Sequence, residues 1–392
     1  MACLLAAACG EGGSQEPAPT ARPTPPPAPA VIEVAPGKPL IVGLSVAMSG
    51  EQAAIGADLV TAAQMAVEDF GAVVGGHLVG VEPRDDACTD PRKAVDVAGI
   101  LTAIPALIGV VGPMCAIGAQ AANPAYEAAM VVHLAPTATR TELSDGGSSF
   151  FFRTAWRDDA QAAVQARYLS RTLEARTVFL IDDAEPYGVR LAEAFEDAFA
   201  GEGGQVTEHQ RVERGETEFG VLARQVVQAA PAAVVFQGLN PEGALLVKAL
   251  REAGYAGIFM GPDGLLSLRD FVPTAGPASE GAVLTGGPVA TPEFVARFTE
   301  RTGHSPTTPF VLQVYDAVTA LLKGASAVAA TAPDGALSLD RAQLAQAIRE
   351  QRFAGLSGSI TFDERGDRRG ETAPELGLRV YRIENAGLVI VE

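Results

Sequence analysis

The sequence predicts an α/β protein made of two doubly wound lobes, each with a parallel sheet covered by helices. Short apolar β runs alternate with helical segments from residue 39 onward, and this alternation is typical of parallel sheets. The alternation starts afresh near residue 157 and continues over a second stretch of similar length. With 392 residues, the chain is long enough for two cores of ordinary size.

The first stretch begins with the apolar run PLIVGLSVA at residues 39–47, which predicts a buried strand. In the segment 58–70, apolar residues recur on one helical face, so a helix is expected there. Asp90 and Pro91 have the residue types of a helix cap and a first helical position. Further strands are expected at 77–85, 106–112 and 130–136, and further helices at 90–103 and 116–129.

The second stretch repeats this pattern with its own strands and helices. Helices are predicted over 158–174, 186–204, 218–229 and 240–254, and strands over 176–183, 205–212, 232–238, 257–261 and 281–286. The remaining chain predicts two helices within 291–329, another near 340–351 and three short β runs before the C-terminus. Ligands of such sheets bind beyond the carboxyl ends of the strands, so the strand-to-helix turns are the candidate sites.

Composition and missing motifs favour a binding protein over an enzyme. The net charge of −18 argues against nucleic acid as a partner, because phosphate binding needs clustered Lys and Arg. The sequence has no phosphate loop, dinucleotide loop, zinc-protease helix or nucleophile elbow. The histidines are scattered, so we expect no metal and no cofactor: His77, His133, His209 and His304. An α/β enzyme with an unrecognised site is the alternative.

The N-terminal segment 1–38 is interpreted as a truncated lipoprotein signal followed by a tether. The sequence MACLLAAACG resembles the lipobox of bacterial lipoproteins, which would place a lipid on Cys9. Residues 11–38 are rich in Pro, Ala, Gly and Ser and are expected to pack no core. We therefore expect contact with a membrane only through a lipid anchor; an unmodified apolar tip is the alternative.

Several segments, found in order between about residues 39 and 380, resemble the leucine/isoleucine/valine-binding protein family. These proteins are the solute-binding subunits of branched-chain amino-acid ABC transporters. The segments include LIVGLSVAMSG, VEPRDDACTDPRKAVDVA, GVVGPMCA, EPYGVRLAEAF, GYAGIFMGPDGL and ITFDERGDRRG. The resemblance implies two lobes of the periplasmic-binding-protein type I fold, joined by a three-strand hinge and closing on a ligand.

The resemblance also implies where the chain passes between the lobes. Crossings are expected near residues 155–159, 284–288 and 370–376. The first lobe would then contain 39–156 plus 286–372, and the second 157–285 plus 373–392.

A disulfide is a further implication of the resemblance. The family pairs a cysteine in a DDAC turn with one in a G-x-x-C turn, which are Cys88 and Cys115 here. Both residues lie in turns after neighbouring strands of one lobe, so a bridge between them is plausible. Two buried free thiols are the alternative.

The family's ligand contacts match several residues of this sequence. Asp263, in GPDG, stands where the family has the acidic residue that meets the ligand ammonium, and Tyr187, in PYG, would be a wall or lid. Thr137, Ala138 and Thr139 match the threonine and main-chain contacts after the fourth strand. A turn-forming Asp263, helix-capping threonines and a core-packed Tyr187 are the alternatives.

Three positions depart from the family pattern. Ala116 replaces a serine whose hydroxyl holds the ligand carboxylate, and Ile55 and Leu239 replace aromatic residues. We expect the turn PMCAIGA, with Ala116 and Ile117, to bind an anion through backbone N–H groups at a helix N-terminus. A branched-chain amino acid is the leading ligand, and an amide or a small carboxylate is the alternative.

The resemblance implies an extracytoplasmic subunit of an ABC importer that works with membrane permease subunits. We expect it to be a monomer. A ligand-sensing module of the same fold is the alternative function.

Overall fold

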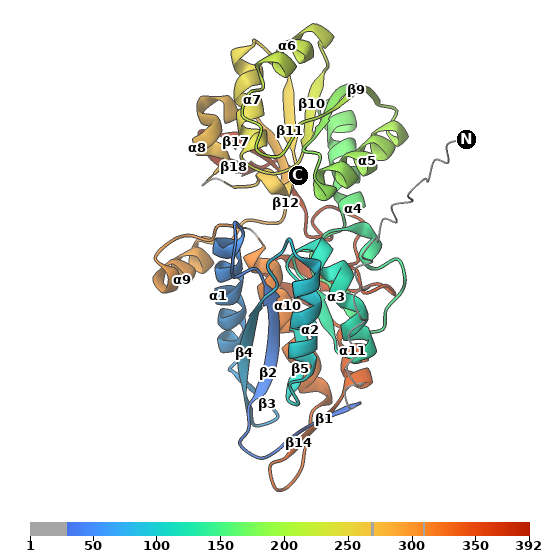
Figure 1. Ribbon diagram of the computed structural model, residues 1–392, viewed down its shortest axis with the longest axis vertical. Helices are drawn as coiled ribbons and strands as arrows, with labels where there is room; N and C mark the ends of the chain where they lie inside the picture. The colour runs from blue at the N-terminus through green and yellow to red at the C-terminus, as the bar shows by residue number, and fades with distance from the viewer. Residues whose placement is uncertain (1–29, 268–269, 309) are drawn as a thin grey trace, which may run out of the picture.

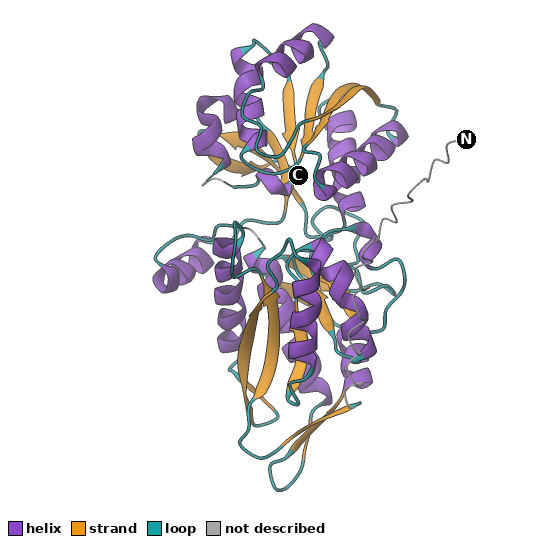
Figure 2. Ribbon diagram, viewed as in Figure 1, coloured by secondary structure: helices purple, strands orange, loops and turns teal. Residues whose placement is uncertain are grey.

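The computed structural model describes residues 30–392 except 268, 269 and 309, and it contains two α/β lobes, one above the other in Figure 1. One sheet has the strand order β3-β4-β2-β5-β6-β7 and the other β18-β17-β12-β11-β10-β8-β9. Helices cover both sheets (Figure 2). Cys9, the predicted lipidation site, lies outside the described residues.

The first lobe is built on a mostly parallel sheet. Its strands are β2 (Leu40–Val46), β3 (Val73–Val74), β4 (His77–Asp85), β5 (Leu107–Val111), β6 (His133–Ala135) and β7 (Phe151–Arg153). Its helices are α1 (Ala53–Asp69), α2 (Pro91–Thr102), α3 (Ala116–Ala128), α9 (Pro292–Thr302), α10 (Val311–Val328) and α11 (Arg341–Arg349). Strand β2 pairs in parallel with β4 and β5, and the parallel pairing continues through β6 to β7.

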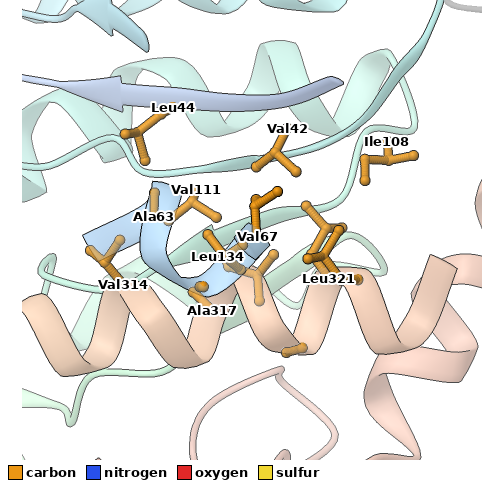
Figure 3. Close-up of a cluster of buried hydrophobic side chains, with 14 of the residues drawn as sticks. Val42, Leu44, Ala63, Val67, Ile108, Val111, Leu134, Val314, Ala317 and Leu321 are labelled. Carbon is orange, nitrogen blue, oxygen red and sulfur yellow. The ribbon is translucent and has the colours of Figure 1, made fainter. Parts of the chain in front are cut away.

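The larger of the two main buried clusters of this lobe lies between the sheet and the helices α1 and α10; the other lies between the sheet and the helices α2 and α3. Figure 3 shows Leu44, Val111 and Leu134 of the sheet close to Val314 and Leu321 of α10. All of these side chains are fully buried. The close approach of helix and sheet requires a glycine in β5: a Cβ on Gly109 would lie 2.8 Å from a Leu321 methyl carbon.

The second lobe has the same design with two antiparallel strands added. Its strands are β8 (Thr177–Asp182), β9 (Gln205–Arg211), β10 (Ala233–Gln237), β11 (Ile258–Gly261), β12 (Val283–Gly286), β17 (Arg379–Glu384) and β18 (Gly387–Ile390). Its helices are α4 (Asp158–Arg167), α5 (Pro186–Gly201), α6 (Gly220–Ala229), α7 (Glu242–Glu252) and α8 (Phe271–Ala275). Strands β8 to β12 are parallel, whereas β17 and β18 pair antiparallel.

Short helical turns connect these elements. They are η1 (Thr141–Leu143), η2 (Tyr168–Thr172), η3 (Asp263–Leu265) and η4 (Gly276–Ser279). The chain passes from the first sheet to the second after β7, returns after β12 and passes again before β17. The residue bounds proposed for the two lobes stay a prediction.

The prediction that residues 11–38 pack no core is wrong for β1 (Val31–Val34). This strand pairs antiparallel with β14 (Leu337–Asp340), which also pairs with β13 (Ala330–Thr331). Ile32 and Val34 are buried in the core of the first lobe, while Val31 and Glu33 face outward. The alternation of buried and exposed residues is typical of a strand with one buried face, and the proline-rich surroundings obscured it.

Two other predictions differ from the structure. The helix predicted over 158–174 is regular only to Arg167 and continues as the wider turn η2. Four strands, not three, follow residue 351, because β15 (Arg352–Gly355) and β16 (Gly358–Thr361) form a hairpin before β17 and β18. Of the described helices, none is long and apolar enough to cross a membrane.

Candidate functional site

A disulfide and a buried carboxylate hold the turn between β5 and α3 in place. Cys88 and Cys115 form the predicted disulfide, with their Cα atoms 5.1 Å apart. Asp86 accepts hydrogen bonds from the backbone N–H groups of Met114 (3.0 Å) and Cys88 (3.1 Å) and from the Ser45 hydroxyl (3.1 Å). Burial raises the pKa of Asp86. Both turns are thus held by one carboxylate and one covalent bond.

This turn presents main-chain N–H groups rather than reactive side chains. Helix α3 begins at Ala116, and the Cys115 side chain at its N-cap makes no capping hydrogen bond. Ala116 is half-buried, and Ile117 is 40% exposed. The Thr137 hydroxyl donates to the Met114 carbonyl and so supports the turn instead of pointing a free hydroxyl at a ligand. An uncapped helix N-terminus is suited to an anion.

The loop after β6 joins this turn to the start of α4. Ala138 is buried with Ala119 and Phe151, so only its main chain is available for a ligand. Thr139 is 5% exposed; its carbonyl accepts the Asp158 N–H (2.9 Å), and its side chain hydrogen-bonds the Asp158 carboxylate.

In the second lobe, Asp263 and Tyr187 are brought together from different elements. Asp263 begins η3 directly after β11, and Tyr187 lies in the first turn of α5. The Tyr187 hydroxyl donates to Asp263 Oδ1 at 2.7 Å. Loss of hydration raises the pKa of Asp263, although hydrogen bonds from Tyr187 and Gln161 oppose this. The same loss of hydration and the nearby carboxylates raise the pKa of Tyr187 well above its usual value.

Leu239 lies beside the same turn. A Cβ on Gly264 would lie 2.7 Å from a Leu239 methyl carbon, so Leu239 packs directly against the residue after Asp263. Ile55, by contrast, is half-buried against the core of the first lobe. Its role as a ligand contact stays a prediction.

Two buried acids of this region were missed by sequence reasoning. Asp158 opens α4, and burial raises its pKa to about 7, with a further increase from the charge of Asp263. Asp183 accepts the backbone N–H groups of Glu185 (3.2 Å) and Leu239 (3.1 Å), and burial raises its pKa to about 6. In sequence, Asp158 reads as an ordinary acidic residue in the first turn of a helix.

Comparison with known proteins decides the family. Residues 39–387 match the periplasmic binding protein family. The chain belongs to this family. The predicted resemblance, the two-lobed α/β fold class and the prediction of a solute-binding protein are therefore confirmed.

Several proteins and solved structures of known name are similar to this chain. A leucine-, isoleucine-, valine-, threonine-, and alanine-binding protein of Pseudomonas aeruginosa is 31% identical over 312 residues, covering 78% of this chain and 80% of that protein. A leucine-binding protein structure from Thermotoga maritima is similar with a TM-score of 0.75 at 24% identity, covering 90% of this chain and 98% of that one. A Streptococcus pneumoniae branched-chain amino acid transporter substrate binding protein, solved with isoleucine, gives a TM-score of 0.76 at 21% identity, covering 90% of this chain and 99% of that one.

Within this family fold, the candidate site has two chemically different sides. The first lobe offers backbone N–H groups at the start of α3, together with Thr139. The second lobe offers the Asp263 carboxylate and the Tyr187 hydroxyl. Hydrogen-bond donors on one side and a carboxylate on the other match a small molecule that carries both an anionic and a cationic group.

Proposed function

We propose that this protein is an extracytoplasmic solute-binding subunit of an ABC importer, which holds a branched-chain amino acid between its lobes. The pairing of Asp263 with Tyr187 carries the proposal, because a half-buried carboxylate that has lost part of its hydration is suited to a cationic partner. A ligand ammonium at Asp263 would form a charge-assisted hydrogen bond of about 1.5–3 kcal/mol. The ligand carboxylate would lie at the N-terminus of α3.

The apolar residues around these groups favour an aliphatic side chain on the ligand. Ile55, Leu239 and Ala116 are the positions where aromatic or hydroxyl side chains are expected, and all three carry small or branched apolar groups. These side chains leave room for a branched aliphatic group on the ligand. They carry no polar atom that would need a hydrogen-bond partner. Ile117 and the main chain of Ala138 would complete the first-lobe wall.

A carboxylate without an ammonium group is the competing ligand class. One similar structure, from Rhodopseudomonas palustris, was solved with benzoate; it shares 18% identity with this chain. A benzoate-like anion would place its charge against Asp263 or leave that carboxylate unpaired. The acidic side of the site therefore favours an amino acid.

The rest of the proposal concerns the setting in which the protein works. We expect it to deliver its ligand to permease subunits in the membrane and to be held there through a lipid on Cys9. We expect a monomer whose two lobes close on the ligand by hinge motion. Mass spectrometry of the N-terminal peptide from membrane-bound protein tests the anchor, and an unmodified Cys9 would contradict it.

The ligand is tested by isothermal titration of the purified full chain. L-leucine, L-isoleucine and L-valine should bind. Two analogues separate the charged groups: 4-methylpentanoate keeps the carboxylate of leucine without its ammonium, and 3-methylbutylamine keeps the ammonium without the carboxylate. Both should bind far more weakly than leucine. If no amino acid binds, or if 4-methylpentanoate binds as tightly as leucine, the proposal is wrong.

A further inference from the structure

Asp158 is a buried acid with an unused oxygen beside the proposed ammonium site. The side chain lies where the chain enters the second lobe and is 4% exposed. One carboxylate contact is made by Thr139. The Oδ1 atom is buried and makes no hydrogen bond to any residue that the structure describes. Buried polar atoms of this kind usually have a partner, so the unused oxygen points to a missing group.

Several charged or polar side chains influence Asp158, from the loop after β6 and from β7, α4, α5 and η3. They are Thr139 and Arg140 from the loop after β6, Arg153 of β7, Asp159 of α4, Tyr187 of α5 and Asp263 of η3.

The two arginines of this set already have other partners. Arg153 donates to Asp367 (2.7 Å), to the Arg140 carbonyl (2.7 Å) and to the Ser144 hydroxyl (2.9 Å). The Arg140 guanidinium donates to Gln120. Asp158 therefore has acids and hydroxyls around it but no side-chain cation of its own within the described chain.

When two carboxylates share a poorly hydrated site, ionising both has a high free-energy cost because their negative charges repel each other. Below about pH 7, the empty site relieves this by keeping Asp158 protonated, because burial and the charge of Asp263 raise its pKa to about 7. An ammonium group has three N–H donors and can satisfy more than one carboxylate at once. When the ammonium group binds, its positive charge offsets the repulsion between the two carboxylates. Asp158 can then lose its proton.

We propose that Asp158 and Asp263 together hold the ligand ammonium, and that Asp158 releases its proton to solvent when the ligand binds. The step forms hydrogen bonds from the ammonium to a newly ionised Asp158 carboxylate, and the proton leaves to the buffer. The inference rests on the proposed function, since it assigns the ammonium contacts of that same site.

Proton release makes binding depend on pH with a fixed sign. Below the pKa of Asp158 in the empty protein, binding must first remove a proton, so affinity falls tenfold for each pH unit. Above that pKa, affinity is constant. Between pH 8.5 and pH 5.5, the affinity for L-leucine should therefore fall about thirtyfold.

The first test titrates L-leucine into wild type and Asp158→Asn at pH 5.5, 7.0 and 8.5, in buffers of different ionisation enthalpy. Wild type should release about one proton per ligand at pH 5.5 and lose affinity as stated. Asp158→Asn should bind at least tenfold more weakly at pH 8.5, with less proton release than wild type and a shallower pH profile. Asp197→Asn, an exposed acid on α5, is the matched control and should follow wild type. A flat wild-type profile, or an Asp158→Asn profile as steep as that of wild type, overturns the proposal.

The second test needs no ligand, and it separates this inference from the proposed function. A group whose pKa is raised by folding stabilises the protein fully below its unfolded pKa, and this stabilisation is lost as pH rises through the folded pKa. The melting temperature of Asp158→Asn should therefore rise relative to wild type between about pH 4 and pH 7, and the difference should then stay constant. If the difference in melting temperature between Asp158→Asn and wild type does not change with pH, Asp158 is not protonated in the empty protein. This result would overturn the inference even if leucine binds. If no amino acid binds wild type, the proposed function fails and the ammonium contacts fail with it, whatever the unfolding result.

Discussion

The first-lobe half of the proposed site is made of main-chain groups, whereas the second-lobe half is made of side chains. In the first lobe, the Cys88–Cys115 disulfide and Asp86 fix the turn that precedes α3. In the second lobe, the functional groups are Asp263 and Tyr187 themselves. Ligand binding by the main-chain half depends on how rigidly the turn is held. Ligand binding by the side-chain half depends on a few functional groups. Substitutions should therefore affect the two halves differently.

Buried amides hold the second-lobe half in place. Gln161 hydrogen-bonds the Asp263 carboxylate and also donates to the Thr285 hydroxyl (3.0 Å). Its side-chain oxygen accepts the indole N–H of Trp156 (2.8 Å). Gln165 donates to the same Thr285 hydroxyl (2.9 Å). The Gln161 side chain thus connects Asp263 to Trp156 and Thr285, which lie where the chain passes between the two lobes.

The largest effect is expected from removing the charge of Asp263. Asp263→Asn keeps the shape of the side chain, but the ligand ammonium loses its counter-ion. Truncating one member of a buried charged pair costs about 2–5 kcal/mol, so affinity for L-leucine should fall by roughly thirtyfold to several thousandfold. Isothermal titration at pH 8 measures this, with Asp197→Asn as the control. Binding equal to wild type would show that Asp263 serves only its turn.

Removing the Cys88–Cys115 disulfide should lower the folding stability more than it lowers the affinity for the ligand. The disulfide closes a loop with a sequence separation of 27, for which the chain-entropy treatment gives about 3–4 kcal/mol. The double variant Cys88→Ser with Cys115→Ser should lose about this much free energy of unfolding in denaturant titrations. Reduced wild type should behave in the same way. A double variant as stable as oxidised wild type would contradict the assigned role of the disulfide.

A smaller and more selective effect is expected in the amide network. Gln161→Met and Gln165→Met each leave the buried Thr285 hydroxyl with one donor fewer, so each should lose about 1–3 kcal/mol of stability. Only Gln161 also contacts Asp263. Gln161→Met should therefore weaken leucine binding about tenfold, while Gln165→Met leaves it near wild type. Equal loss of affinity in both variants would mean that the network supports the lobe without positioning Asp263.

Sequence reasoning worked where one local pattern determines the structure. Asp90 accepts the Arg92 N–H at 3.0 Å and caps α2 as predicted, with Pro91 at its first position. The strand over residues 77–85 has the predicted bounds because its alternation and flanking turns agree. The predicted disulfide is present, but the strands that lead to its two turns are not neighbours as expected: β4 and β5 lie on either side of β2, and the turns beyond their ends meet across it.

The rest depended on contacts between residues distant in sequence, which periodicity does not show. Strand β1 exists because β14, about 300 residues later in the chain, offers it an edge. Asp158 is buried where its N–H donates to the loop after β6, and the charge of Asp263, more than 100 residues later in the chain, acts on it. Nothing in the letters DDAQ separates it from Asp159, its exposed neighbour. Burial of a single acid is a tertiary property, so the acidic half of the site was predicted only in part.

The smallest effect is expected at Ala116, where the first-lobe half lacks a hydroxyl. Ala116→Ser adds a donor at the N-terminus of α3, next to the proposed position of the ligand carboxylate. A single added hydrogen bond contributes about 0.5–1.5 kcal/mol, so affinity for L-leucine should tighten by about two- to tenfold, and it should not weaken. Ala128→Ser, at the exposed far end of the same helix, is the control for any change in α3 itself. Weaker leucine binding by Ala116→Ser alone would show that the methyl group is an apolar wall. Combined with an Asp263→Asn variant that binds like wild type, that result would reverse the assignment of the two halves and exclude an amino acid held in this orientation.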